Sequence, residues 1–491
     1  MKKIGLVIIS FLLFSNAFSQ EQYTTGLLFS QEKYSKVKEL APLTTRSFTS
    51  IPSSYSLKAY CPTPLSQGRQ PSCVGWASGY AARTISNAVK KGWAYNTSLI
   101  NQNIYSPAFV YNVIKSKEDI YCKRGSYIAD AMYLIKNYGI TKYKDFPYSD
   151  QKCSSKPSQY GMQLAKQNKI ATFLKLANWD NPYKLADKVK KALANKNPVV
   201  IGMRVSSSFY KVNGVWSGVQ VGKVGGHAMV VMGYDDNKYG GAFELMNSWG
   251  TRWGNNGFGW VRYADFEKYV KTAYVMVDNI KNPPPAPKPK PSPKPQPKPK
   301  PEVVALQGSM TLQLSSGSNM PVQLNPDASR NFNIVSAQKT TYSVATPYTS
   351  GTQFRIRFKS DKPAYVYLIG YGGGDKSVNA LYPFDNYSAY FGFSNSEVAI
   401  PNEDYFIEMD NVKGKDILCI LYSTKPLEIK KIVQSLKYGS GTFTSKVKTY
   451  FKNDMYNSKE VKFDKNSIGF TAKSSNSSSN LVPVFISINH N

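Results

Sequence analysis

The chain of 491 residues contains only two histidines, His227 and His490, and only five cysteines. It has no Cys-x-x-Cys pair and no cluster of histidines, which argues against a zinc site, so we expect no metal and no other cofactor. An odd number of cysteines leaves at least one thiol unpaired in an oxidising compartment. Cys122 and Cys153 are the preferred candidates for a disulfide, although Cys61 could replace either partner.

Long apolar runs are also missing after the first twenty residues, because no later segment approaches the roughly 18 to 20 consecutive apolar residues that cross a bilayer. The chain begins with two lysines, an apolar stretch over 4–14, and small residues at 17–19. This pattern is typical of a secretory signal peptide. We therefore expect a signal peptide at 1–19, a secreted or periplasmic product, and no transmembrane segment after cleavage.

Acidic residues are scarce, with 31 Asp and Glu against 62 Lys and Arg, which gives a formal charge of +31. Such an excess would favour anionic cell-surface material as a partner. The basic residues are spread through every region and are not interleaved with aromatic residues in one block, which favours a generally solvated basic surface. We expect no specific binding of nucleic acid.

Cys73 follows a loop rich in turn residues and precedes a run of small residues over 77–89 that is compatible with a buried helix ending near Gly92. A thiol in the first turn of a helix meets unpaired backbone N–H groups and the positive end of the helix dipole. Both favour the reactive thiolate, so we interpret Cys73 as a nucleophile. A buried structural cysteine is the alternative for this residue taken alone.

Three further side chains suit such a nucleophile. His227 is the only histidine before the penultimate residue and would act as general base and acid. Asn247 would accept a hydrogen bond from the imidazole and hold the ring in place, and Trp249 would cover that bond. The amide of Gln67 would join the Cys73 backbone N–H in an oxyanion hole, whose donors are each worth about 3 kcal/mol.

Apolar periodicity predicts two more helices, one around 128–135 that ends at Gly139 and one at 183–194. The period then changes, and three β-type runs follow at 198–205, 227–234 and 242–246. A helical half therefore precedes a β half.

Proline alternates with lysine in residues 281–301, which predicts an extended polyproline spacer. The lead-in segment 20–49 is polar, without a strong period, and is expected to be extended. Residues 302–491 have strand-like sequence patterns throughout, which predict an all-β sandwich or barrel. We find no catalytic constellation in that last region.

Together these motifs resemble the papain-like cysteine peptidases over residues of about 50 to 280. Gln67 and Cys73 match the glutamine and nucleophile of that family at the same separation, His227 matches its Gly-His-Ala motif, and Asn247 begins its Asn-Ser-Trp-Gly motif. The resemblance implies an α+β fold with a helical lobe and a β-barrel lobe, and a cleft between the two. It also implies hydrolysis of peptide bonds in peptide or protein substrates through a thioester at Cys73.

The resemblance further implies that Gly125 and Ser126 form the backbone edge that binds an extended substrate and that Tyr127 lines the neighbouring pocket. Two positions depart from the family. Gln70 replaces the usual cysteine before the nucleophile, and Val74 replaces an aromatic residue after it. The Ser-Cys-Val-Gly-Trp form is similar to bacterial members. The N-terminal extension is too short for the large inhibitory prodomain of many relatives.

The region after the spacer resembles an uncharacterised bacterial domain that is appended to peptidases and other enzymes, on the strength of residues 363–368, 381–383 and 400–401. This resemblance implies attachment or substrate targeting. Two other functions stay open from the sequence. One is a non-catalytic binding or scaffold protein on a decayed peptidase fold, and the other is an acyl transferase that uses the same residues.

Overall fold

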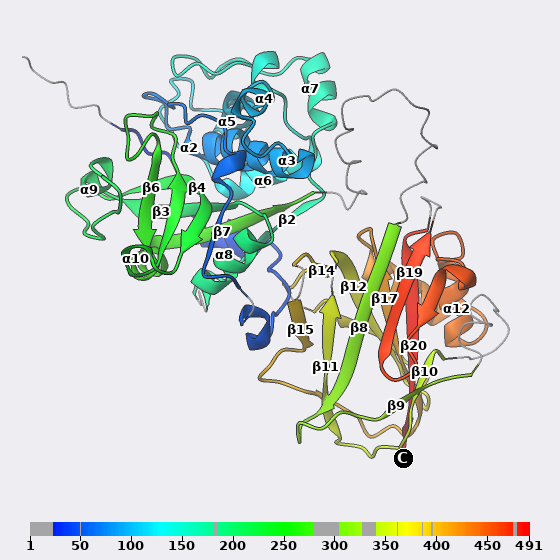
Figure 1. Cartoon of the computed structure of the whole chain (residues 1–491). Coiled ribbons are helices and arrows are strands. Elements are labelled where there is room, and N and C mark those ends of the chain that lie inside the picture. The colour runs from blue at the N-terminus through cyan, green and yellow to red at the C-terminus, as the bar shows by residue number, and fades with distance from the viewer. Residues whose placement is uncertain are drawn as a thin grey trace, which may run out of the picture.

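The computed structural model describes residues 23–49, 51–180, 184–278, 304–326, 340–360, 362–384, 386–393, 396–474 and 479–491. The expected signal peptide and the Pro/Lys-rich spacer lie outside these residues. Helices gather in one part of the first domain, a sheet forms its other part, and the β-rich domain follows (Figure 1).

The helical lobe is built around one long helix that begins at Cys73, as the sequence predicted. It runs through α2 (Cys73–Gly75), a π-helical stretch (Trp76–Arg83) and α3 (Thr84–Lys91), and ends at Gly92, whose φ of +68° suits glycine. Every residue from Cys73 to Arg83 is buried, the large Trp76 and Tyr80 as well as the small residues between them. The surrounding helices are α4 (Thr97–Asn101), α5 (Pro107–Ile114), α6 (Ile128–Asn137) and α7 (Gln159–Lys166).

The second lobe carries a sheet with the order β2-β7-β3-β4-β5-β6, and β1 pairs with β4. Its strands are β1 (Ser54–Ser56), β2 (Thr172–Lys175), β3 (Val199–Val205), β4 (Gly225–Asp235), β5 (Ala242–Met246), β6 (Phe258–Arg262) and β7 (Val270–Val277). The three predicted β-type runs are confirmed as β3, β4 and β5. Among the described residues β2 and β6 do not pair with each other, so the sheet is open and the expected barrel closure is not found.

Three helices accompany this sheet, namely α8 (Leu185–Ala194), α9 (Ser207–Tyr210) and α10 (Tyr263–Tyr269). The predicted helix at 183–194 corresponds to α8, whose buried Leu185, Val189 and Leu193 recur at a spacing of four residues.

The C-terminal domain contains two sheets, with the orders β13-β12-β17-β20-β10-β9 and β15-β11-β8-β19-β18. The first sheet also pairs β14 with β12, and the second pairs β16 with β11. The strands are β8 (Val304–Leu314), β9 (Val322–Leu324), β10 (Tyr342–Val344), β11 (Gln353–Ser360), β12 (Ala364–Tyr371), β13 (Val378–Tyr382), β14 (Tyr390–Phe391), β15 (Ser396–Ile400), β16 (Ile407–Glu408), β17 (Gly414–Ser423), β18 (Val461–Phe463), β19 (Ile468–Ser474) and β20 (Leu481–His490).

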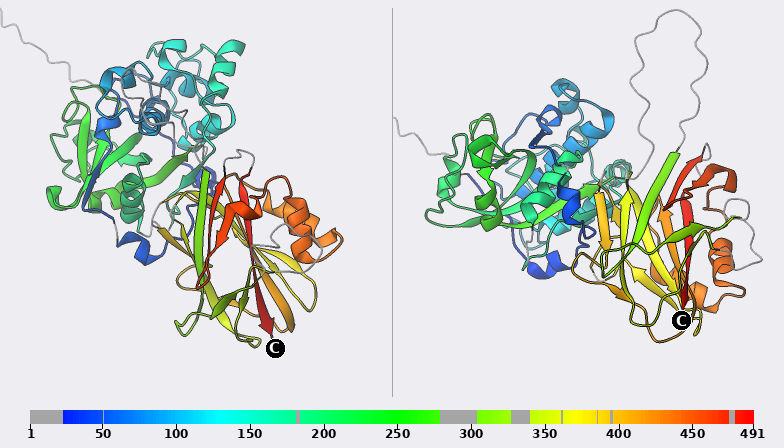
Figure 2. Two further views of the ribbon diagram at one scale, coloured as in Figure 1. Left: turned by 45° about the vertical axis from the view of Figure 1, so that its right-hand side comes forward. Right: turned by 60° about the horizontal axis from the view of Figure 1, so that its bottom comes forward.

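Apolar side chains of both sheets, such as Ile356 and Ile420, meet in one core, which is the arrangement of a β-sandwich. The domain also contains α11 (Ile429–Tyr438) and α12 (Phe443–Tyr450), which the sequence analysis did not predict. Figure 2 shows this helical pair beside the strands. Ile432 and Leu436 are the buried residues of α11, and an apolar pair at this spacing is a helical signal.

The lead-in segment contains the short helix α1 (Gln31–Ser35), passes between the two domains and then forms a 3-10 helix at Thr45–Phe48. At Glu39 it bridges both Lys175 of β2 and Tyr387 of the C-terminal domain. The chain returns to the first domain at β1, which pairs with β4. In Figure 1 the blue lead-in can be followed from the sheet of the first domain to β15. No helix in the described part of the chain is long and apolar enough to cross a membrane.

Candidate active site

Cys73 lies at the first residue of α2 and is fully buried. Burial raises the pKa of the Cys73 thiol to about 12, while hydrogen bonds with the backbone of Ala228, Gly26 and Val74 act in the opposite direction. The sequence analysis expected the helix N-terminus to favour the thiolate. The backbone contributions do act in that direction here, but the loss of water around the sulfur outweighs them, so the net shift of the Cys73 pKa is upward.

His227 and Asn247 are brought together by the pairing of β4 with β5, since Asn247 directly follows the last residue of β5. The His227 Nε2 atom lies 2.7 Å from Asn247 Oδ1, and the Ser248 backbone N–H donates to the same oxygen at 2.7 Å. Oδ1 is an acceptor, so Nε2 carries the hydrogen. Nδ1, which has no hydrogen-bond partner in the described part of the chain, is then left as the acceptor of the ring.

The imidazole of His227 is also completely buried. Burial lowers its pKa to about 4, and the hydrogen bond that His227 donates to Asn247 opposes this shift. The thiol and the imidazole are therefore both held in their neutral forms in this arrangement.

Trp249 stacks on the His227 ring, with the ring centroids 4.3 Å apart and an angle of 23° between the planes. Tyr23 of the lead-in stacks on Trp249 in turn, at 4.8 Å and 13°. The indole Nε1–H of Trp249 donates to the carbonyl oxygen of Thr24 at 3.0 Å. The predicted cover over the His227 and Asn247 pair is thus in place, and the lead-in adds a second layer to it.

Gln67 is buried beside the loop before Cys73. Its Nε2 donates to the Gln70 carbonyl oxygen at 2.9 Å, and its Oε1 accepts from Ser248 Oγ at 2.7 Å. One of the two amide hydrogens is thereby engaged, and the other is still available as a donor. Gln70 is itself buried, and its Nε2 donates to the Ser149 carbonyl oxygen at 3.5 Å.

The predicted substrate-binding edge is occupied by the chain's own lead-in. Ser126 N–H donates to the Gly26 carbonyl oxygen at 2.9 Å, and the Leu28 N–H donates to the Ser126 carbonyl oxygen at 3.0 Å. The Gly26 and Leu27 N–H groups both donate to Gly226, at 3.2 and 3.0 Å. Residues 24–28 therefore lie along both the Ser126 edge and the β4 strand that carries His227.

Glycine is needed on both sides of this contact. A Cβ on Gly125 would lie 2.1 Å from the Gly26 carbonyl oxygen, and a Cβ on Gly26 would lie 2.1 Å from the Pro71 carbonyl oxygen. Both distances are far below van der Waals contact. Tyr127 follows the edge at the N-cap of α6, and the Lys33 ammonium lies 4.7 Å from its ring centroid. Leu27 and Tyr127 line the same small pocket.

The remaining cysteines are structural. Cys122 and Cys153, the pair favoured from the sequence, are joined in a disulfide with their Cα atoms 5.8 Å apart. Cys61 and Cys419 are free and buried, as Cys73 is. Within the described residues no three His, Cys, Asp or Glu side chains gather in a way that could hold a metal ion.

Sequence reasoning missed the residues that cover the site and one that supports it. The cover comes from Tyr23 to Leu28, and Ser248 links Gln67 to the Asn247 strand end. A signal for the cover was present in the sequence, since Thr-Thr-Gly-Leu-Leu-Phe at 24–29 is an apolar stretch within a polar lead-in.

Comparison with known proteins finds one family match in each of the two domains. Residues 64–276 match the family described as papain family cysteine protease, and residues 347–426 match a domain of unknown function (DUF4384). The chain is 26% identical over 195 residues to the uncharacterized peptidase C1-like protein L477 of Acanthamoeba polyphaga mimivirus, which covers 37% of this chain and 61% of that protein. It is 33% identical over 152 residues to the senescence-specific cysteine protease SAG39 of Oryza sativa subsp. indica, covering 29% of this chain and 39% of that protein.

Among solved structures, the chain is similar to xylellain, a cysteine protease from Xylella fastidiosa, with a TM-score of 0.44 and 22% identity over 52% of this chain and 96% of that one. The chain spans less than two thirds of the length of the two curated relatives above. It contains a papain-family cysteine protease domain followed by a DUF4384 domain.

Proposed function

We propose that this protein is an exported cysteine peptidase that hydrolyses peptide bonds in peptide or protein substrates through a thioester at Cys73. The observation that carries the proposal is the 2.7 Å contact between His227 Nε2 and Asn247 Oδ1, with Trp249 stacked on the imidazole. This contact fixes the tautomer that leaves Nδ1 available for the thiol proton.

In the proposed reaction the Cys73 sulfur attacks the carbonyl carbon of the scissile bond while His227 Nδ1 takes the thiol proton. The second amide hydrogen of Gln67 and the Cys73 backbone N–H stabilise the oxyanion. His227 then gives its proton to the leaving amine, and the C–N bond breaks. Water, activated by the same imidazole, hydrolyses the thioester and restores the thiol.

The arrangement seen here precedes that reaction, because residues 24–28 occupy the edge where a substrate would bind. A substrate must displace them. Displacement brings water back to Cys73 and His227 and removes the burial that holds both groups neutral, so that proton transfer from the thiol to the imidazole becomes easier.

We further propose that residues 1–19 direct export and are removed, leaving the enzyme secreted or periplasmic. The net charge of +31 supports contact with anionic cell-surface material. Neither this role nor the chemistry above calls for a metal or an organic cofactor.

The proposal is tested by labelling the purified protein with an epoxide probe of thiol peptidases and by measuring peptide hydrolysis. We expect labelling and turnover that disappear in Cys73→Ala but persist in Cys61→Ala, which removes another buried thiol. Because the lead-in covers the site, the same assays are run on a variant with a loosened lead-in, Gly26→Ala. The proposal is wrong if neither protein shows labelling and turnover that depend on Cys73.

A further inference from the structure

The lead-in pairs with a sheet edge of the C-terminal domain. β15 is an end strand of its sheet, and residues 42–44 of the lead-in pair with it on its outer side. The Thr44 N–H donates to the Glu397 carbonyl oxygen at 2.9 Å, and the Ala399 N–H donates to the Pro42 carbonyl oxygen at 3.3 Å. This is the mode in which an exposed sheet edge binds an extended peptide.

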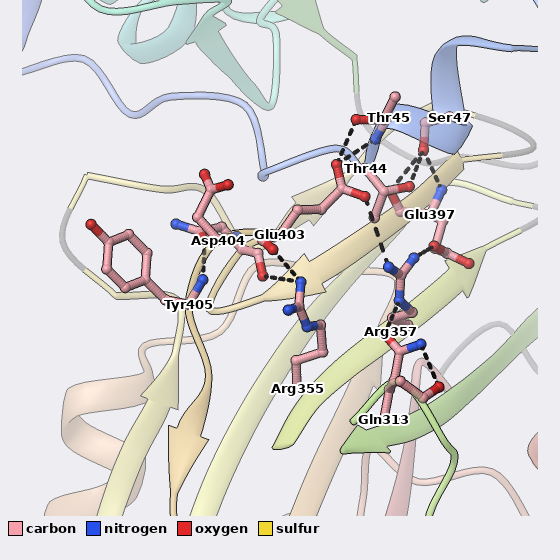
Figure 3. Close-up of polar contacts among 12 residues, drawn as sticks. Thr44, Thr45, Ser47, Gln313, Arg355, Arg357, Glu397, Glu403, Asp404 and Tyr405 are labelled. Carbon is pink, nitrogen blue, oxygen red and sulfur yellow. Dashed lines mark hydrogen bonds and ion pairs between the residues drawn. The ribbon is translucent and has the colours of Figure 1, made fainter. Parts of the chain in front are cut away.

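Side chains reinforce the pairing, as Figure 3 shows. Ser47 Oγ donates to the Glu397 carbonyl oxygen and accepts from the Glu397 N–H, each at 2.7 Å. The Thr45 N–H and hydroxyl both donate to the Glu403 carboxylate, at 2.6 and 2.8 Å. Arg357 forms ion pairs with Glu397 and Glu403 and donates to Gln313, so the surface that receives the lead-in is ordered by its own domain.

Apolar side chains of the lead-in also pack against the C-terminal domain. Ala41 belongs to the core of the β-sandwich, and the neighbouring Leu40 belongs to a cluster that contains the peptidase core together with residues of the C-terminal domain such as Tyr390. Both side chains are only 3% exposed. Leu43 lies beside Val398 in the same small pocket.

The segment around Glu39 is hydrogen-bonded on both of its edges. Toward the C-terminal domain the Glu39 N–H donates to the Asn386 carbonyl oxygen at 2.7 Å and the Glu39 carbonyl oxygen accepts from Ser388 N–H at 2.8 Å. Toward β2 the neighbouring residues continue the ladder, since the Leu40 N–H donates to the Lys175 carbonyl oxygen at 2.9 Å. The Glu39 carboxylate meets the Lys188 ammonium of α8 at 3.4 Å. The lead-in is thus a segment that is hydrogen-bonded to both domains.

We propose that the C-terminal domain is the docking site for residues 39–47 of the lead-in, and that this docking keeps residues 24–28 over Cys73. The inference rests on the proposed function where it concerns access to the nucleophile. A strand that is bonded on both edges can leave only by breaking both sets of hydrogen bonds, so it opens less often than a strand bonded on one edge. The domain of unknown function thereby holds the lead-in over the site. We call residues 39–47, together with the surface of the C-terminal domain that they contact, the latch.

Docking is tested in the full chain carrying Cys73→Ala, so that the result does not depend on catalysis. A site for a sequence-specific protease is placed within 281–301, and the folded protein is cut there and analysed by gel filtration. We expect the two halves to elute together. Ala41→Glu, which puts a charge at a buried position of the latch, should separate them, whereas Arg46→Ala, an exposed position on the same segment, should not. Halves that separate with an intact lead-in would overturn the proposal.

The latch is tested by hydrogen exchange of the amides at 24–28 in the uncut Cys73→Ala protein. We expect exchange at least about tenfold faster in Ala41→Glu than in Arg46→Ala. The milder double variant Thr45→Val with Ser47→Ala, which removes only side-chain hydrogen bonds, should show a smaller increase in the same direction and serves if Ala41→Glu does not fold. Unchanged exchange in the folded latch variants would overturn the proposal. Failure of the peptidase proposal would instead appear as missing Cys73 labelling, with exchange and elution still as expected.

Discussion

Replacing Gly26 by alanine should open the active site. A Cβ at this position would lie 2.1 Å from the Pro71 carbonyl oxygen and 2.4 Å from its carbonyl carbon. These are backbone atoms of the loop before Cys73, so they cannot swing aside as the end of a flexible side chain would. The lead-in must therefore move away from the loop, and with it the hydrogen bonds that hold residue 26 to Ser126 and Gly226.

The expected size of the effect follows from these bonds. Gly26 accepts from Ser126 at 2.9 Å and donates to Gly226 at 3.2 Å. If both are lost at a net value of about 1 kcal/mol each, the covered state is weakened by about 2 kcal/mol. Since about 1.4 kcal/mol corresponds to a factor of ten, the open fraction should rise about 30-fold.

The assay is the rate at which an epoxide probe labels Cys73, followed by intact mass. Gly161→Ala is the matched control, because a Cβ there meets its nearest neighbour at an ordinary 3.5 Å. We expect Gly26→Ala to be labelled about 30 times faster than the control, with Cys73→Ala unlabelled. Equal rates in Gly26→Ala and Gly161→Ala would refute the view that residues 24–28 limit access to Cys73.

Three further predictions concern the site and its scaffold. In the Gly26→Ala background, Asn247→Ala should lower kcat/KM for a peptide substrate about 10- to 100-fold with little change in KM, because a hydrogen bond to a charged imidazolium is worth about 1.5 to 3 kcal/mol; an unchanged kcat would contradict the orienting role. Burial lowers the pKa of His227 from 6.5 to about 4, so between these values the unfolded chain binds a proton that the folded chain does not. The free energy of unfolding is therefore not reduced by His227 above pH 6.5. It falls by up to about 3 kcal/mol, through the titration of this residue, as the pH falls to 4. Urea unfolding of Cys73→Ala should show this loss relative to Cys73→Ala with His227→Gln, and parallel pH profiles would count against it. Reduction of the Cys122–Cys153 bond, which closes a loop with a sequence separation of 31 residues, should lower the free energy of unfolding by about 2 to 4 kcal/mol. A reductant should have no such effect on the double variant Cys122→Ser with Cys153→Ser.

Much of the peptidase domain could be predicted from local patterns. The apolar pattern that predicts an element lies within one continuous segment for the helix from Cys73 to Gly92, the helix before Gly139 and the strands β3, β4 and β5. The helices α11 and α12 were missed because most segments of the last region have strand-like sequence patterns, and the whole region was interpreted as β. The open sheet could not have been foreseen, since closure depends on how strands at its two ends are placed.

The direction of the thiol pKa shows the limit of local reasoning most directly. A helix N-terminus does stabilise a thiolate, and the backbone hydrogen bonds of Ala228, Gly26 and Val74 do lower the pKa of Cys73. Two of these three residues lie far from Cys73 in the sequence, and the burial that reverses the net shift comes from the whole fold. The sequence pattern around Cys73 contains no information on this burial.

The sequence by itself determined which side chains are candidates for the proposed chemistry, because a thiol nucleophile needs a base and an orienting acceptor, and the two histidines of the chain leave His227 as the candidate base. Only the tertiary structure decided whether that chemistry is accessible. The lead-in reaches Ser126, Gly226 and the edge of β15 through backbone hydrogen bonds between residues that are far apart in the sequence. Backbone pairing of this kind uses groups that every residue carries, so it leaves little trace in the sequence and is settled only when the sheets are in place.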